Sequence, residues 1–264
     1  ELIDESCKRH KEIIPEIEEL SGIDAQYGDF DWMELACTEQ EELELRNTFC
    51  ETLKSPFVSW LSSEDIRLLE PRTTPDARGA IYIANQAQVD AYKLTLAFAQ
   101  AAESLGVTIR YGDVTGLKTA HNRVSGLTTT IGDIEGDSVV FAIGSWSKRL
   151  EDWIGMDVPV EPLKGQTIHL QIPGPPLPCN IHHGSNYVAP KIGGTVISGT
   201  FDGYLGFDTT IHEEGNEFIT QGVQNICPGI LESKVVSYVT GLRPASADWL
   251  PIIGPIPEID GAYI

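Results

Sequence analysis

The sequence has no long hydrophobic run, few basic residues and no closely spaced cysteine pair. No apolar stretch approaches the ~20 residues that a membrane-spanning helix needs, so we expect no membrane span. The opening residues, ELIDESCKRH, lack the apolar core of a signal peptide. Eighteen Lys and Arg residues against 39 Asp and Glu residues give a formal net charge of -21. Such a charge repels phosphate backbones and argues against nucleic-acid binding.

The cysteine usage predicts a reduced, cytoplasmic protein without a metal site. Five cysteines are an odd number, and none stands in a C-x-x-C pair. The adjacent His182 and His183, with Cys179 nearby, raise the alternative of a metal site. Adjacent side chains diverge on a strand, however, and no further ligand has convincing spacing. We therefore expect a loop there and no bound metal.

The pattern of apolar residues changes along the chain. The first part alternates helices and strands, whereas strands dominate after residue 157. This mixture predicts an α/β part joined to a largely antiparallel part. Helices are expected at 1–20 (interrupted by Pro15), 38–53, 62–70, 91–105, 146–153 and 212–226. Strands are expected at 23–37 (two), 79–84, 107–111, 115–119, 123–130, 138–143, 166–172, 186–190, 195–201 and 234–242.

The most regular unit runs from Asp90 to Tyr111. Asp90 is a good N-cap, and Gly106 is a good helix stop. Leu94, Ala97 and Ala101 lie on one apolar face between them. This pattern predicts a helix followed by a strand from Val107.

Two motifs carry residue types that suit ligand binding. In Gly-Leu-Arg-Pro, Pro244 biases Arg243 toward an extended backbone, and guanidinium is a planar fork suited to a carboxylate. The alternative is an ordinary surface arginine before a turn. The run SVVFAI at 138–143 reaches Gly144, where bare backbone at a helix start could approach an anionic ligand. Here the alternative is a tight strand-to-helix turn.

Five segments together resemble the D-amino acid oxidase and glycine oxidase superfamily of FAD-dependent oxidoreductases. They are VVFAIGSWS at 139–147, VEPLKGQ at 160–166, the NYVAP and VISGTF hairpin at 186–201, GLRP through PIIG at 241–254, and the helix-strand unit ending in Val114. The resemblance implies part of a Rossmann-like FAD-binding domain and a substrate domain with a large antiparallel sheet.

The resemblance also implies which residues form the site. Arg243 and Tyr187 would hold a substrate carboxylate, and Phe201 would line the pocket. For Lys164 the alternative is an ordinary exposed lysine, so it receives only modest functional weight. The implied FAD contacts are Val114, Ala142, Ile143, Gly144, Trp146 and Arg243. No catalytic acid or base is expected, because hydride removal by a flavin depends chiefly on geometry and on the neutral amine.

The implied reaction is oxidative deamination of a small, glycine-like amino acid or amine. Oxygen is the acceptor, and the products are an oxo acid, ammonia and hydrogen peroxide. Bacterial enzymes of this kind often supply thiamine biosynthesis. Two alternatives stay open, a dehydrogenase that passes electrons to a carrier and a non-catalytic remnant without a cofactor site. Self-association into a homo-oligomer is also left open.

The expected domains are discontinuous. Residues 1–20, 85–157 and 246–264 would belong to the FAD-binding domain, and residues 21–84 and 158–245 to the substrate domain. No G-x-G-x-x-G follows a strand, although the superfamily carries that phosphate-binding fingerprint. We therefore expect the chain to be an internal fragment that, alone, binds FAD weakly or not at all.

Overall fold

The protein is described by a computed structural model that covers residues 2–52 and 55–264. Contacts divide the chain into two compact units. The first comprises Glu1–Ile109, Gln166–Phe201 and His212–Val239; the second comprises Arg110–Gly165, Asp202–Ile211 and Thr240–Ile264. None of the helices in the described ranges has the length and apolar character needed to cross a bilayer.

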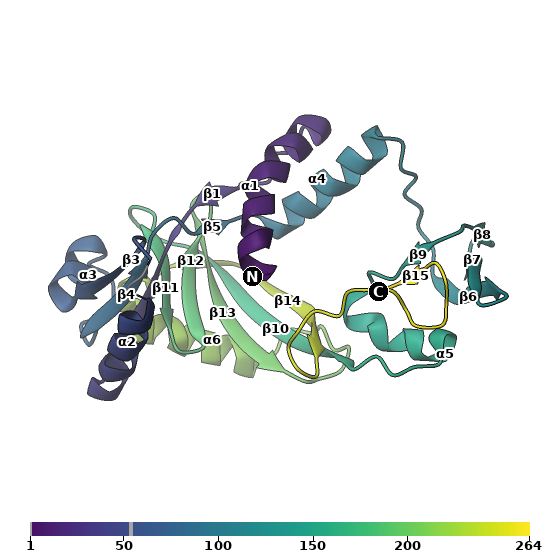
Figure 1. Cartoon of the computed structure of the whole chain (residues 1–264). Coiled ribbons are helices and arrows are strands. Elements are labelled where there is room, and N and C mark those ends of the chain that lie inside the picture. Colours follow the sequence, from purple (N-terminus) through teal and green to yellow (C-terminus); the bar gives the residue numbers. More distant parts are fainter. Residues whose placement is uncertain (1, 53–54) are drawn as a thin grey trace. The chain divides into compact units, whose positions relative to one another are not determined.

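A mixed sheet of eight strands has the order β14-β10-β13-β12-β11-β2-β4-β3 (Figure 1). Strand β11 pairs with β2 in parallel, whereas β11–β12, β12–β13, β2–β4 and β3–β4 are antiparallel. The strands are β2 (Asp31–Ala36), β3 (Val58–Ser62), β4 (Gly79–Ile83), β10 (Val160–Gln171), β11 (Cys179–His183), β12 (Asn186–Pro190), β13 (Thr195–Gly203) and β14 (Lys234–Ser246).

Helix α6 (Glu213–Ile226) covers β11 and β12 in the first unit. Its buried residues Ile219, Val223 and Ile226 recur at helical spacing, so they form one apolar stripe. They join Met33 and Ile181 in the main core of this unit. The short helix η2 (Pro228–Ile230) follows α6.

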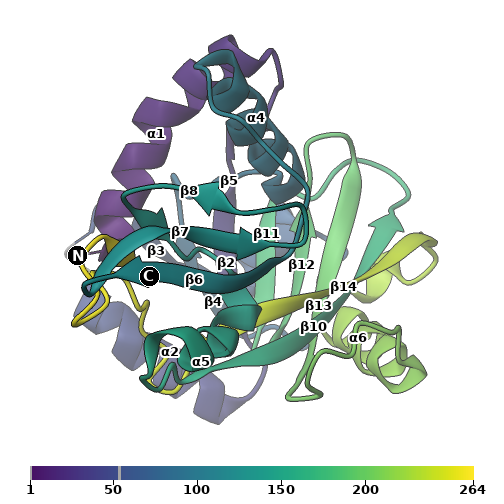
Figure 2. The same ribbon diagram turned by 90° about the vertical axis from the view of Figure 1, so that its right-hand side faces the viewer.

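Helices α1 (Leu2–Ser21) and α4 (Ala91–Ser104) pack side by side in the first unit (Figures 1 and 2). Ile17 meets the small residues Ala97 and Ala101 between them. α1 continues through Pro15 without a break, and Asp90 caps α4 by accepting the Lys93 N–H at 2.9 Å. The other elements of this unit are β1 (Gly28–Asp29), α2 (Glu39–Thr52), α3 (Ser63–Leu69) and β5 (Ala87–Gln88).

The second unit contains a three-stranded sheet and a second apolar core. His121 and Asn122 have φ values of 52° and 59°, which suit a two-residue hairpin turn between β6 and β7. Phe141, Leu150 and Ile256 lie in the core. The elements are β6 (Val114–Ala120), β7 (Arg123–Thr129), β8 (Ile134–Glu135), β9 (Val139–Val140), η1 (Gly144–Leu150), α5 (Glu151–Ile154) and β15 (Ala262–Tyr263).

Three of the predicted elements are wrong, and their surroundings explain why. Residues 107–111 form no strand, because no strand in the described part of the chain pairs with them; Tyr111 is 94% exposed. The predicted buried strand at 138–143 shortens to the two-residue strand β9, which pairs with β15 and leaves Val140 69% exposed. The expected loop at His182 and His183 is strand β11, and β3 was not predicted. Leu53, the expected end of α2, lies outside the described residues.

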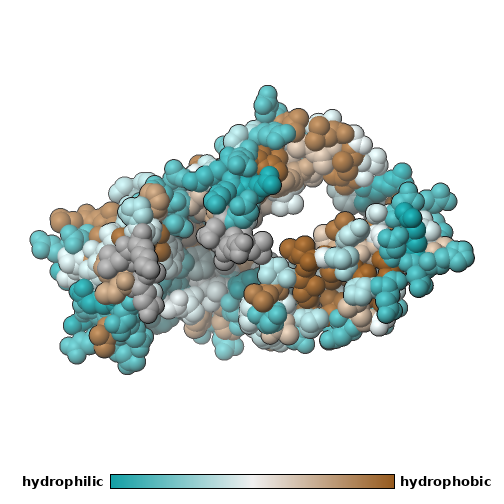
Figure 3. Space-filling model, viewed as in Figure 1, coloured by the Kyte–Doolittle hydropathy of each residue, from teal (hydrophilic) through white to brown (hydrophobic). Residues whose placement is uncertain are grey.

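The two compact units differ from the predicted functional domains. Residues 1–20 and 85–109 belong to the same compact unit as most of the large sheet. Within this unit α1 packs on α4, and the Asp90 N–H donates to the Ala25 carbonyl at 3.0 Å. The division into FAD-binding and substrate domains stays a prediction. Figure 3 shows hydrophobic surface over α4. The apolar side chains of Leu96 and Phe98 on this helix are exposed.

Candidate functional site

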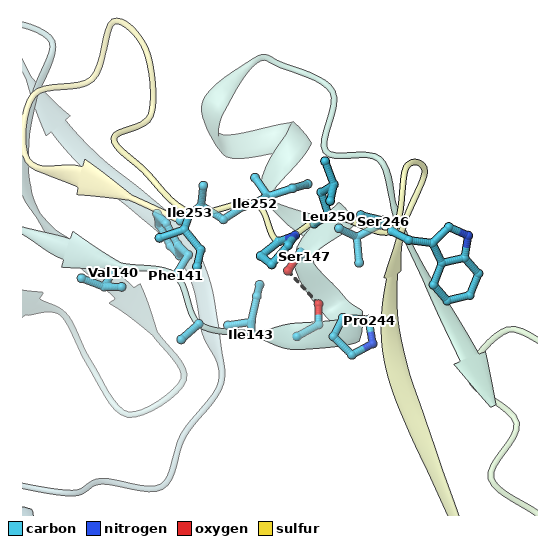
Figure 4. A pocket seen from close by; sticks show the side chains of 15 residues that line it. Val140, Phe141, Ile143, Ser147, Pro244, Ser246, Leu250, Ile252 and Ile253 are labelled. Carbon is cyan, nitrogen blue, oxygen red and sulfur yellow. Dashed lines mark hydrogen bonds between the residues drawn. The ribbon is translucent and has the colours of Figure 1, made fainter. Parts of the chain in front are cut away.

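An apolar pocket of about 550 Å³ lies within the second unit. Two segments form most of its lining, residues 140–144 and the stretch from Pro244 to Ile253 that follows Arg243. Figure 4 shows side chains of both segments, including Phe141, Ile143 and Ile252, around the same space. A mostly apolar cavity of this size is typical of a cofactor or small-molecule site.

Three of the predicted FAD contacts, Ala142, Ile143 and Gly144, line this pocket. Gly144 has φ +55°, a conformation that L side chains rarely adopt, and an added Cβ would meet no atom within 4 Å. The glycine is therefore required by the turn rather than by crowding. Ser147 fixes the turn, since its hydroxyl donates to the Gly144 carbonyl at 2.7 Å. Backbone without a side chain consequently borders the cavity at this point.

Val114, Trp146 and Arg243 do not line this pocket. Val114 begins β6 and pairs with Thr129. Trp146 stacks on Phe207, with ring centroids 5.4 Å apart and planes 26° apart. Their predicted contacts with FAD stay predictions, and Pro244, beside Arg243, does line the pocket.

The guanidinium of Arg243 binds a carboxylate within the second unit. Its Nη1 lies 3.1 Å from Asp202 Oδ2, and its Nη2 lies 2.5 Å from Asp202 Oδ1. Gly165 makes room for it, because a Cβ there would stand 2.6 Å from Nη2. The Arg243 side chain is still 50% exposed. The fork geometry expected from the sequence is thus present, here with an internal carboxylate.

Lys164 is buried, with 1% of its side chain exposed. Its ammonium donates to Asp208 Oδ2 at 3.2 Å and to the Thr210 carbonyl at 2.5 Å. The sequence had left open an ordinary exposed lysine at this position, which is wrong. Lys164 instead fixes the segment 202–211, which also supplies Asp202 to Arg243 and Phe207 to Trp146. Sequence reasoning missed this segment, because its acids lie about 40 residues from their partners.

Tyr187 belongs to an aromatic stack in the first unit. Its ring is stacked on His182 at 5.5 Å, and Trp32 lies 4.9 Å from His182 on a tilted plane. Burial lowers the pKa of His182 to about 4, so this imidazole is uncharged at neutral pH. Gly199 lies opposite Tyr187 on β13, where an added Cβ would stand 2.9 Å from the phenol oxygen. The position of Tyr187 therefore depends on a bare backbone across the ladder.

Phe201 packs against the main core of the first unit. Its ring lies 5.8 Å from that of Phe218, and an added Cβ on Gly215 would stand 2.9 Å from it. This packing accounts for an aromatic residue at the position. The predicted roles of Phe201 in lining a substrate pocket and of Tyr187 in holding a carboxylate stay predictions.

His182 and His183 have separate environments. Cys179, which stood close in sequence, is buried, and its thiol pKa is raised to about 12 by burial and nearby carboxylates. His183 Nε2 instead lies 3.3 Å from Glu41 Oε1, across 142 residues of sequence. No spacing or motif in the sequence points to this partner.

Comparison with known proteins gives a consistent result. A family model described as "FAD dependent oxidoreductase" (DAO) matches residues 3–264. The glycine oxidase of Geobacillus kaustophilus is 31% identical over 254 residues, which cover 94% of this chain and 67% of that protein. The bifunctional protein ThiO/ThiG of Trichormus variabilis is 29% identical over 96% of this chain and 40% of that protein. The crystal structure of glycine oxidase from Bacillus cereus superposes with a TM-score of 0.93 at 27% identity, covering 98% of this chain and 72% of that one. The chain thus spans two thirds or less of the two curated relatives.

Proposed function

Because the chain belongs to the DAO family of FAD-dependent oxidoreductases, we propose that it takes part in the oxidation of a small, glycine-like amino acid or amine. Oxygen is the proposed acceptor, and an oxo acid, ammonia and hydrogen peroxide are the proposed products. The observation that carries the proposal is the pocket of the second unit, where Ala142, Ile143 and Gly144 face the segment that begins at Pro244.

The lining of this pocket fits a flat, largely apolar ring system such as that of FAD. Phe141, Ile143 and Ile252 supply apolar surface, and Gly144 leaves backbone uncovered. Ala142, Ile143 and Gly144 are the residues that we propose hold the cofactor. When bound, FAD supplies the two-electron oxidation of the carbon that bears the amine.

Arg243 is the proposed anchor for the substrate carboxylate. Its guanidinium already engages both oxygens of Asp202, and half of the side chain is exposed. Such bidentate pairs fix direction as well as distance. A substrate held in this way presents the same carbon to the oxidant each time, so binding energy serves orientation. Asp202 holds the guanidinium in place until the substrate arrives. Its carboxylate also competes with that of the substrate for the same N–H donors of Arg243.

A cytoplasmic location is part of the proposal. The chain has five free cysteines, and no described helix has the length and apolar character to span a bilayer. The likeness to ThiO/ThiG supports a role in supplying thiamine biosynthesis.

The proposal is tested by peroxide release. The product of the native gene is purified with FAD and offered glycine, sarcosine, D-alanine and D-proline in air. Acetate, a carboxylate without an amine, is the control. Peroxide that forms with glycine or sarcosine and depends on FAD supports an oxidase. Reduction of an artificial electron acceptor without peroxide favours the dehydrogenase alternative. A protein that neither binds FAD nor turns over any amine is the non-catalytic alternative.

A further inference from the structure

Cys37, Glu41 and His183 form a cluster of three metal-binding side chains in the first unit. Their ligand atoms all lie within 4.8 Å of one another. The fold explains this meeting. Strands β2 and β11 run in parallel as neighbours, so their carboxyl ends reach the same edge of the sheet. Cys37 directly follows β2, His183 ends β11, and Glu41 stands in the first turn of α2.

The distances are close to those of a tetrahedral zinc site. With metal–ligand bonds of about 2.0–2.3 Å, neighbouring ligand atoms in a tetrahedron are about 3.3–3.6 Å apart. His183 Nε2 and Glu41 Oε1 are 3.3 Å apart, which already meets this condition. The Cys37 sulfur needs to approach by no more than about 1 Å, within the reach of a χ1 adjustment.

The carboxylate of Glu41 is oriented by the backbone. Its Oε2 accepts the N–H of Cys37 at 2.8 Å and the N–H of Thr38 at 2.9 Å. Oε1 is thereby directed toward His183. Partial burial alone raises the pKa of Glu41, but these N–H groups and His183 lower it overall, so the group is ionised at neutral pH. Hydrogen bonds of this kind orient metal ligands in known sites.

Carboxylates other than that of Glu41 also lie near the cluster. Burial, with the charges of Glu41 and Asp76, raises the pKa of the Cys37 thiol to about 11. The Glu34 carboxylate stands close by, where it accepts the Gly184 N–H at 3.2 Å. Besides the ligand Glu41, the carboxylates of Glu34 and Asp76 are therefore close enough to act on the cluster, while Arg67 and Arg78 also line the hollow beside Cys37.

The cluster is also accessible. A hollow of about 650 Å³ in the first unit is lined by Cys37, Thr38 and Asp76. His183 and Glu41 are each partly exposed. A hydrated ion can therefore reach the sulfur and exchange its waters for protein ligands.

We propose that Cys37, Glu41 and His183 bind one Zn²⁺ ion, with water as the fourth ligand. One thiolate, one imidazole and one carboxylate suit Zn²⁺ rather than Mg²⁺ or Ca²⁺, which take oxygen ligands. On binding, the thiol releases its proton to solvent, and the sulfur–zinc bond replaces the S–H bond. The ion ties the start of α2 to the end of β11. This site is independent of the flavin chemistry proposed above, and it replaces the expectation from sequence spacing that no metal binds.

Cobalt substitution tests the proposal without any activity assay. The metal-free, reduced chain is titrated with Co²⁺, and the visible and near-ultraviolet spectra are recorded. One equivalent should give tetrahedral cobalt bands with a thiolate-to-cobalt charge-transfer band. Cys37→Ser should lose the charge-transfer band. The matched control, Cys50→Ser, removes an exposed thiol outside the cluster and should keep it.

Zinc affinity gives the second measurement, by competition with a chromophoric chelator. His183→Gln should weaken Zn²⁺ binding by more than the about 10–100-fold that loss of an outer-shell partner costs, because it removes a direct ligand. Zn²⁺ should raise the Tm of the native chain and of Cys50→Ser, but not of His183→Gln. Far-ultraviolet circular dichroism confirms that each variant is folded. Two results would overturn the proposal: a native chain that shows no charge-transfer band, or Cys37→Ser and His183→Gln variants that bind metal as the native chain does. In either case Glu41 only caps α2 and pairs with His183, and any bound metal is an adventitious ion only.

Discussion

The ion pair between the buried Lys164 and the partly exposed Asp208 allows a prediction whose magnitude depends on which partner is removed. Only 1% of the Lys164 side chain is exposed, whereas 32% of the Asp208 side chain is. If the acid is removed, the ammonium stays buried with one charge partner fewer. If the lysine is removed, the carboxylate can still be hydrated. The two single variants should therefore differ in their effect on the free energy of unfolding.

The magnitude follows from the geometry. Two unit charges 3.2 Å apart attract by about 5 kcal/mol at an effective dielectric constant of about 20. Removal of one partner from a buried pair typically costs about 3–5 kcal/mol. In Asp208→Asn the amide oxygen can still accept from the ammonium, so we expect a loss of about 2–4 kcal/mol. In Lys164→Met the side chain keeps its volume and Asp208 becomes hydrated, so we expect about 1 kcal/mol.

Urea unfolding followed by circular dichroism measures both values, and the Tm should fall by about 2–4 °C for each kcal/mol. Asp133→Asn, which removes the partner of the exposed Lys118, is the matched control and should cause no measurable change. The reasoning is refuted if Lys164→Met destabilises the protein as much as Asp208→Asn does, because the asymmetry of burial would then have no energetic effect.

Three further predictions concern Arg243 and the aromatic stack. Arg243→Ala should lower kcat/KM for glycine at least about 100-fold, because two charge-assisted hydrogen bonds are lost, with FAD content as the check that the cofactor is retained. Gly165→Ala should raise KM, since its Cβ would stand 2.6 Å from Arg243 Nη2; Gly116→Ala, whose Cβ would have 3.8 Å of clearance, should not. His182→Phe should flatten the pH dependence of stability. Because the folded pKa of about 4 lies below the ordinary 6.5, the unfolded chain binds more protons between these values, and native stability is lost as pH falls from about 6.5 toward 4. Urea unfolding at several pH values measures how the free energy of unfolding changes with pH. If this change is the same in His182→Phe as in the native protein, burial of His182 is not its cause.

Elements with strong local signals were predictable from the sequence. Asp90 and Gly106 bound a clear apolar stripe, and the structure has helix α4 at that place. The hairpin across His121 and Asn122 was equally clear, because two residues with positive φ suit its turn. The FAD-dependent family was also correctly identified, since its motifs are spread over most of the chain.

Elements that depend on distant partners were not predictable. The stretch from Val107 to Tyr111 is rich in β-branched and aromatic residues and so has the composition of a strand, but a strand needs a neighbour to complete its ladder. His182 looked like part of a loop, although β2 pairs with it from about 150 residues away in sequence. No local pattern marked Lys164 as buried, because its acid lies 44 residues further along the chain. Local sequence records propensity, whereas these positions are set by packing.

The most direct test of the proposed function is the anaerobic reaction of the FAD-loaded native gene product with glycine. The account predicts that glycine bleaches the visible absorbance of the bound flavin, and that Arg243→Ala, loaded with the same amount of FAD, is bleached far more slowly. If a fully loaded native protein keeps its oxidised flavin spectrum with glycine, sarcosine and D-amino acids alike, the proposed oxidation of a small amino acid is contradicted.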